Sequence, residues 1–374
     1  MAGPKFIDKG FQFWPANEMA LATDDVVRMY ERGFAGAYQE PEETEQFEDL
    51  IRSRGGNVRG EEIATSSGWA ESGQGKLILP FLHALEQYPG CLPGPGQQRG
   101  DCVAHSEKNA NLITYACEVA AGLPDEVTGL IERVPEIPTA GLLQGAFSTE
   151  TFYWFRGHGG DGWSCDASSR VAMRNAGLIT RDNHADIGVD LTRYSGRNAG
   201  LYGRRPPTGS VANALARNLI RQATTVRDRE ARRDFLANGY ALHTCGGEGW
   251  ANTRDKHGVS RRRGGWAHAM PDVAFDDRPS TRQLYGDSLE LIQNSWARWN
   301  SGPRDIRDSA QYVPPEKRER WIALDIVNPQ TGNIMIPHGS FWALSRDVSR
   351  RRFIAKSSVD GWPRLSVPHG HASW

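Results

Sequence analysis

The order of its secondary-structure signals constrains this chain more than any other sequence feature. Helix-like segments come first: apolar residues follow Asp101 at helical spacing, and further helices are expected over Ala167–Ala176 and Arg227–Ala237. Four short strands are expected after them, at Tyr240–Thr244, Ala267–Phe275, Ser288–Gln293 and Phe341–Ser345. Helices followed by a run of strands are typical of an α+β fold and not of a doubly wound one.

Charge is balanced along the chain. Of its 374 residues, 44 are Lys or Arg and 45 are Asp or Glu, so the formal net charge is -1. Such a balance gives no long-range field to attract nucleic acid or an anionic membrane, and neither is expected as a partner. Two arginine runs, Arg261–Arg263 and Arg350–Arg352, are interpreted as solvated loops.

Segments that would direct the chain out of the cell or into a membrane are not expected. The N-terminal residues lack the apolar core of a secretory signal, and no stretch approaches the ~18 apolar residues of a membrane helix. The sequence therefore predicts a soluble protein, cytoplasmic or associated with a virion.

The five cysteines, at positions 91, 102, 117, 165 and 245, are odd in number and widely spaced. No Cys-x-x-Cys pair is present, which argues against a zinc ribbon, and a disulfide framework is not expected in so long a chain without a signal. Cys165, His243 and Cys245 could form a metal cluster with one another, but ordinary packing is the favoured interpretation. No metal and no cofactor is expected.

The first 76 residues differ in composition from the rest. They contain an acidic helix candidate at Asp24–Ala37, an acidic, turn-rich run at Pro41–Asp49 and a Gly-rich end. We interpret 1–76 as a partly structured extension and 77–374 as the main domain. Within that domain a helical part is expected over 77–205 and a β part over 206–374.

Cys102 stands where a reactive thiol would be expected. It follows Gly-Asp at the start of the helical stripe formed by Val103, Ala110, Ile113 and Cys117, and Asp101 is a good capping residue. A thiol is nucleophilic as thiolate, and both a helix N-terminus and a nearby imidazolium lower its pKa.

His268 and Asn294 are the candidates for the other two parts of such a site. His268 begins an apolar strand between small residues, including Ala267, which leave room for a substrate. Asn294 ends the next strand, and its amide can accept the imidazole N–H while Trp296 shields that bond from water. His105, one turn along the helix from Cys102, is a second candidate base, although no third group for it is evident.

Six segments occur in the order found in one known family, the papain-like (C1) cysteine peptidases, which the chain resembles over roughly residues 97–350. The matching segments are Gln97…Cys102, His158-Gly-Gly160, Glu230…His243, His257-Gly-Val259, Asn294-Ser-Trp296 and Gly339…Ser345. Asn294-Ser-Trp296 matches the family motif letter for letter. His268 lies 166 residues after Cys102 and Asn294 lies 192 after it, against roughly 130–150 in the family.

The resemblance implies a papain-like fold, with a helical subdomain built on the nucleophile helix and an antiparallel, barrel-like β subdomain. It also implies a Cys-His-Asn triad that hydrolyses a peptide or related amide bond through an acyl-enzyme. The oxyanion would be held by the Cys102 N–H and by Gln97, with Gln98 as the alternative. Gly159 and Gly160 would pair with an extended substrate backbone.

Several residues depart from the family pattern. Val103 replaces the Trp that usually follows the Cys, Arg99 replaces a disulfide Cys, and Gly96 stands at the usual position of the oxyanion Gln. A polar, Pro-rich insertion covers 297–337. These departures leave the substrate class open.

A second hypothesis is therefore a catalytically silent papain-like protein that serves in a virion or larger assembly. Its partner would contact the 1–76 extension or the 297–337 insertion. An intact Cys/His/Asn set favours the enzyme, whereas an insertion filling the cleft would favour the silent scaffold.

Overall fold

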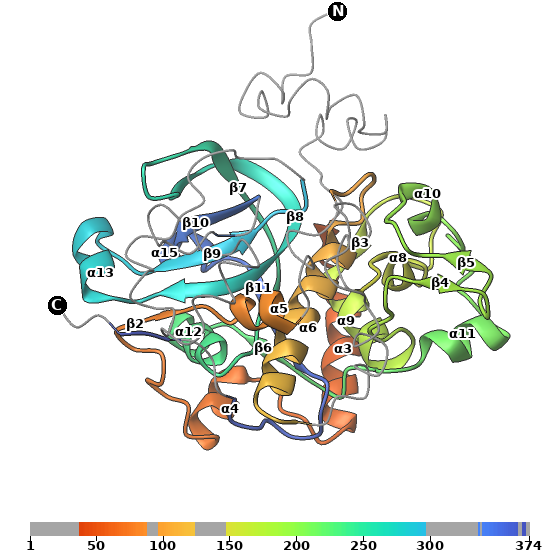
Figure 1. The fold of residues 1–374 in the computed structure, drawn as a ribbon, viewed down its shortest axis with the longest axis horizontal. Coiled ribbons are helices and arrows are strands. Elements are labelled where there is room, and N and C mark those ends of the chain that lie inside the picture. Colours follow the sequence, from red (N-terminus) through yellow and green to blue (C-terminus); the bar gives the residue numbers. More distant parts are fainter. Residues whose placement is uncertain are drawn as a thin grey trace, which may run out of the picture.

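The computed structural model describes residues 37–87, 96–123, 147–296, 336, 339–365 and 369–371. In this part of the chain one long helix lies between an antiparallel sheet and a group of shorter helices (Figure 1). The α+β class expected from the sequence is confirmed. The helix candidate before residue 37 and nearly all of the 297–337 insertion lie outside the described residues.

The main sheet follows the order β10-β9-β8-β7-β11-β6, and every neighbouring pair on this path is antiparallel. In that order the strands are Ser340–Leu344, Leu289–Gln293, Ser260–Asp276, Leu242–Arg254, Arg352–Ser357 and Gln222–Val226. β2, Lys76–Ile78, pairs with β8 and with β12, His369–His371. Among the described residues the path does not close, so the barrel-like half is an open sheet there.

The strands β7 and β8 form a hairpin much longer than the sequence predicts. The expected strand Ala267–Phe275 lies within β8, whereas the expected strand Tyr240–Thr244 begins two residues before β7 and covers only its first three residues. Beyond them the pairing shifts register repeatedly between Gly246 and Arg254. Such irregularities break the two-residue alternation by which a strand is recognised in a sequence.

The central helix, α6, spans Cys102–Ala120 and is buried along nearly its whole length. It packs against β8 on the sheet side and against α5 (Phe81–Gln87), α8 (Glu150–Tyr153) and α9 (Cys165–Arg174). Burial on all sides explains why polar as well as apolar residues of α6 are enclosed. Its N-terminal end therefore meets the sheet in the interior of the molecule.

Shorter elements surround this centre. The further helices are α3 (Pro41–Ser53), α4 (Gly60–Ser66), α10 (Gly196–Ala199), α11 (Gly209–Leu215), α12 (Arg229–Ala237), α13 (Pro279–Tyr285) and α15 (Ser345–Val348). Two short ladders complete the described structure: β1 (Ala37–Tyr38) runs parallel to β3 (Trp163–Ser164), and β4 (Asn183–His184) pairs antiparallel with β5 (Val189–Asp190). No helix in the described part of the chain is long and apolar enough to cross a membrane.

The acidic run at Pro41–Asp49 is a helix, so its interpretation as turn-rich is wrong. Pro41 opens α3 and two glutamates occupy its first turn, where acidic groups favour a helix start. Phe47, Leu50 and Ile51 form its buried face. The division at residue 76 stays a prediction, but α3 packs directly against α9 and β6.

The two arginine runs differ from each other. Arg261–Arg263 is exposed but lies within β8 rather than in a loop. Arg351 is buried and Arg352 pairs with Asp166 at 2.6 Å, so the interpretation of the second run as a solvated loop is wrong. A sequence run of like charges does not reveal which side chain points inward.

Candidate functional site

Cys102 is the first residue of α6 and is fully buried. Its sulfur accepts a backbone hydrogen bond from Ala269, the residue that follows His268 on β8. The backbone N–H groups of Cys102 and Val103 also favour the thiolate, as expected at a helix start. Burial outweighs these donors and, with the Asp101 carboxylate, raises the pKa of the thiol above its usual value.

His268 and Asn294 form the hydrogen bond that the sequence predicts. His268 Nε2 lies 3.0 Å from Asn294 Oδ1. The same oxygen accepts the backbone N–H of Trp296 at 3.1 Å, which identifies it as the amide oxygen. Since an amide oxygen only accepts, Nε2 carries the proton and Nδ1 carries the lone pair. Nδ1 is buried without a hydrogen-bond partner among the described residues.

Two tryptophans enclose the imidazole. The ring of Trp296 stacks on His268 at 4.6 Å between centroids, with an interplanar angle of 23°. Trp266 meets the same ring edge-on at 6.1 Å. Trp296 is buried and therefore can shield the His268–Asn294 bond from water, as the sequence predicts.

The surroundings of His268 keep its ring neutral. Burial lowers its pKa to about 3, the Asn294 bond acts in the opposite direction, and the charges of Arg351 and His105 lower it further. At neutral pH the ring can therefore accept a proton. With both side chains enclosed, we expect Cys102 to be a thiol and the ring of His268 to be neutral.

Asp101 does not cap α6, which corrects the expectation from the sequence. Its side chain makes no capping bond. Oδ2 instead accepts the Tyr194 hydroxyl at 2.7 Å and lies 3.6 Å from His105 Nε2. His105, the alternative base, thus faces Asp101. Tyr194 carried no signal in the sequence, because it comes from a distant loop.

Gln97 and Gln98 occupy the loop before Cys102 in different ways. Gln97 Oε1 accepts from Ser295 Oγ at 2.6 Å and its Nε2 donates to the Arg99 carbonyl at 2.7 Å. Gln98 Oε1 accepts from the Gly196 N–H at 2.9 Å. Gln97 therefore lies beside the Asn294–Trp296 segment, while Gln98 is bound to α10. Their oxyanion role stays a prediction.

The predicted substrate-binding glycines lie in an exposed bend tied to the nucleophile loop. Gly159 and Gly160 are exposed, and Ala267 is partly buried beside His268. Asp161, next to Gly160, accepts from Arg99 Nε at 2.7 Å. Arg99, a departure from the family pattern, thus links the bend to the loop before Cys102 by an ion pair.

Arg351 is a charged neighbour that sequence reasoning missed. Its Nη2 donates to the Glu248 carbonyl at 2.7 Å. Its stem fills the space over Gly246, where a Cβ would lie 2.5 Å from Cγ, and Gly246 is paired with His268. Burial lowers the pKa of Arg351 to about 10. No signal in a run of three arginines singles it out.

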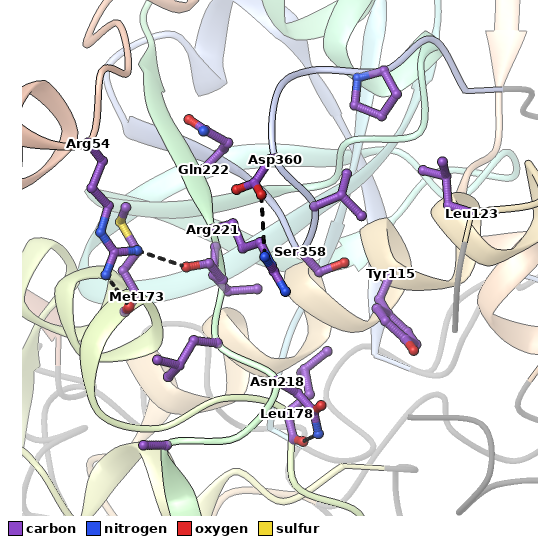
Figure 2. Close-up of a pocket in the computed structure, with 15 residues that line it drawn as sticks. Arg54, Tyr115, Leu123, Met173, Leu178, Asn218, Arg221, Gln222, Ser358 and Asp360 are labelled. Carbon is purple, nitrogen blue, oxygen red and sulfur yellow. Dashed lines mark hydrogen bonds and ion pairs between the residues drawn. The ribbon is translucent and has the colours of Figure 1, made fainter. Parts of the chain in front are cut away.

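One cavity lies away from these residues. About 860 Å³ in volume, it is lined by Tyr115 and Leu123 at the far end of α6, together with Arg54, Asn218 and Asp360 (Figure 2). Tyr115 lies 13 residues after Cys102 on the helix, which is about 20 Å at 1.5 Å per residue. This cavity is therefore separate from the Cys102–His268 site.

Comparison with known proteins gives similarity at the level of solved structures alone. No protein-family model and no curated protein matches the chain. Xylellain, a cysteine protease from Xylella fastidiosa, is 14% identical over 71% of this chain and 82% of its own, with a TM-score of 0.40. Digestive procathepsin L2 proteinase from Tenebrio molitor is 9% identical over 76% and 68%, with a TM-score of 0.37. ProCathepsin B S9 from Trypanosoma congolense is 11% identical over 75% and 77%, with a TM-score of 0.38.

Proposed function

We propose that this chain is a thiol-dependent hydrolase of peptide or related amide bonds. The observation that carries the proposal is the 3.0 Å bond from His268 Nε2 to Asn294 Oδ1. That bond leaves Nδ1 of the ring as a proton acceptor, while Ala269, the next residue, donates to the Cys102 sulfur. Covalent catalysis by a thiol requires a nucleophile, a base and a group that orients the base. The Asn294–His268 bond and the Ala269–Cys102 bond supply two of the links between these groups.

In this mechanism Cys102 gives its proton to His268 Nδ1 and its sulfur attacks the substrate carbonyl carbon. The oxyanion is held by the Cys102 N–H and by the Gln97 amide, which must first release the Arg99 carbonyl; one such donor is worth about 3 kcal/mol. His268 then protonates the leaving amine and a thioester remains. Water, deprotonated by His268, hydrolyses the thioester and restores the thiol.

Substrate contacts follow from the same arrangement. Gly159 and Gly160 present exposed backbone that an extended peptide can pair with. Trp296 and Ala267 border His268 and would contact the leaving half of the substrate, because His268 protonates that half. A peptide or protein is therefore the proposed substrate.

A catalytically silent scaffold is the second candidate, and one observation favours it. Cys102 and His268 both have 0% exposure. Burial also moves their pKa values in the directions that oppose a thiolate–imidazolium pair. In that case the partner would be an assembly component bound through the 1–76 extension or the 297–337 insertion.

The pH dependence of Cys102 alkylation separates the two candidates. The rate is measured by mass spectrometry with iodoacetamide from pH 5 to pH 9 for the wild type, His268→Ala and the control His184→Ala. An enzyme should label Cys102 rapidly near pH 6, and His268→Ala should slow this at least tenfold, because the proton acceptor is gone. Cys117, buried in the same helix, reports any general opening of the fold.

A different pH dependence of Cys102 labelling would contradict the hydrolase proposal. If Cys102 labelling only follows an ordinary thiol with a pKa near 8.5, or a higher one, and is the same in His268→Ala, the hydrolase proposal is wrong. If labelling is rapid and depends on His268, cleavage of a mixed peptide library follows, with Cys102→Ala as the inactive control.

A further inference from the structure

Cys165, His243 and Cys245 come together in the interior. Cys165 begins α9 in the helical half, whereas His243 and Cys245 lie on β7 in the sheet. Their ligand atoms all lie within 4.8 Å of one another, and all three residues are buried. The two cysteines are joined as a disulfide, with Cα atoms 6.4 Å apart, so the sequence-based expectation of ordinary packing here is wrong.

Both ring nitrogens of His243 have hydrogen-bond partners in the disulfide form. Nδ1 lies 2.7 Å from Ser106 Oγ, which fixes the ring as an outer hydrogen bond does in metal sites. Nε2 lies 3.3 Å from Ser168 Oγ, and the ring also interacts with the Cys165 backbone.

A buried carboxylate stands beside this ring. Glu107 Oε2 is 3.5 Å from His243 Nε2. Glu107 lies outside the group whose ligand atoms are all within 4.8 Å of one another, so its carboxylate must move towards the sulfur atoms to complete a tetrahedral set. Oε2 also accepts from Ser168 Oγ at 3.1 Å and Ser169 Oγ at 3.0 Å, and the other oxygen binds Lys356 Nζ at 2.8 Å.

A disulfide does not require this polar surrounding. Enclosing a carboxylate, an ammonium group and an imidazole in the core is costly unless the charges are paired with one another or with a bound ion. We propose that the reduced form of Cys165 and Cys245, with His243, binds one Zn²⁺ ion, and that Glu107 supplies the fourth ligand. Two thiolates and a carboxylate carry three negative charges, which the ion and Lys356 balance.

The disulfide is then the metal-free, oxidised form of the same site. A dithiol or phosphine reductant supplies two electrons to open the S–S bond and is itself oxidised, and two protons give the free thiols. Zinc binding releases both thiol protons, because the thiolate is the ligand. Either form joins the helical half to the sheet, because Cys165 lies on α9 and Cys245 lies on β7. Cys245 is in turn paired with Ala269, the donor to Cys102.

Cobalt binding to the reduced protein tests the site. The full chain is treated with a water-soluble phosphine, desalted without oxygen and titrated with Co²⁺, whose thiolate charge-transfer and visible bands report tetrahedral sulfur ligation. We expect one equivalent per chain, displaced by Zn²⁺. Cys165→Ser and Cys245→Ser should lose the bands, and Glu107→Gln should weaken binding at least tenfold. Cys102→Ser and Cys117→Ser should bind as the wild type does.

Thermal unfolding supplies a second readout in case a variant folds poorly. Zn²⁺ should raise the melting temperature of the reduced wild type and of Cys102→Ser, but not that of Cys165→Ser. The proposal is wrong if the reduced wild type binds no more Co²⁺ than Cys165→Ser does. It is equally wrong if Cys102→Ser abolishes the bands, because the metal would then occupy the candidate catalytic site.

Discussion

The neutral, buried ring of His268 couples the stability of the protein to pH. Its pKa is about 3 in the folded chain and about 6.5 in the unfolded chain, so the unfolded state binds more protons between these values. Unfolding free energy therefore falls as the pH drops from 6.5 towards 3, by about 1.4 kcal/mol per pH unit for this one residue.

Urea unfolding at several pH values between 4 and 7 measures this contribution. His268→Gln keeps a polar ring-sized group but cannot titrate, so its unfolding free energy should fall less steeply with pH than that of the wild type. Equal slopes for the two proteins would show that the ring is already protonated, or accessible to water, in the folded state.

A buried ion pair joins two elements of the sheet half. Arg232 on α12 donates to Glu290 on β9 at 2.7 Å, and neither side chain is exposed. Burial and the neighbouring Glu290 raise the pKa of Asp272 well above its usual value. Removing one partner of such a pair leaves an uncompensated buried charge.

Arg232→Met is accordingly expected to reduce the free energy of unfolding by about 3–5 kcal/mol. Arg52→Met is the matched control, because Arg52 is 52% exposed and its ion pairs should be worth about 1 kcal/mol or less. Adding Glu290→Gln to Arg232→Met should recover part of the loss, measured by chemical denaturation. A double variant no more stable than Arg232→Met would contradict the charge argument.

Individual helices and strands are predicted well from the sequence where local pattern and burial agree. The helix ended by Asn238-Gly239 was expected over Arg227–Ala237 and spans Arg229–Ala237, because its apolar stripe and its stop signal coincide. α3 was missed because its acidic side dominates the composition while only three residues face the core. The capping role of Asp101 failed because Tyr194, a partner fixed by tertiary structure, binds its carboxylate.

The described part of the 1–76 segment contributes buried side chains to the hydrophobic core of the molecule. Phe47 has 0% exposure on the face of α3 that packs against α9 and β6. Phe47→Ala should lower the free energy of unfolding by about 3–5 kcal/mol, whereas Glu45→Ala on the exposed side should change it by about 0.5 kcal/mol or less. A small effect of Phe47→Ala, followed by denaturation, would mean that α3 is a dispensable attachment.

The arrangement of the candidate site can be predicted from the sequence only in part. Motif order suggested that His268 and Asn294 meet, and their hydrogen bond exists. Burial of Arg351, the Arg99–Asp161 link and the meeting of Cys165 with Cys245 depend on contacts between segments far apart in the chain. Arg is usually exposed and Cys is usually buried, but no local pattern in the sequence shows which distant partners these residues meet.

The long sequence separation of the site also sets when its chemistry can begin during synthesis. Cys102 leaves the ribosome 166 residues before His268 and 192 before Asn294, the latter being residue 294 of 374. Throughout that interval the thiol of Cys102 lacks the base and the orienting amide of the proposed triad, so its reactivity is that of an ordinary cysteine. The proposed triad can form only after Asn294 has been synthesised.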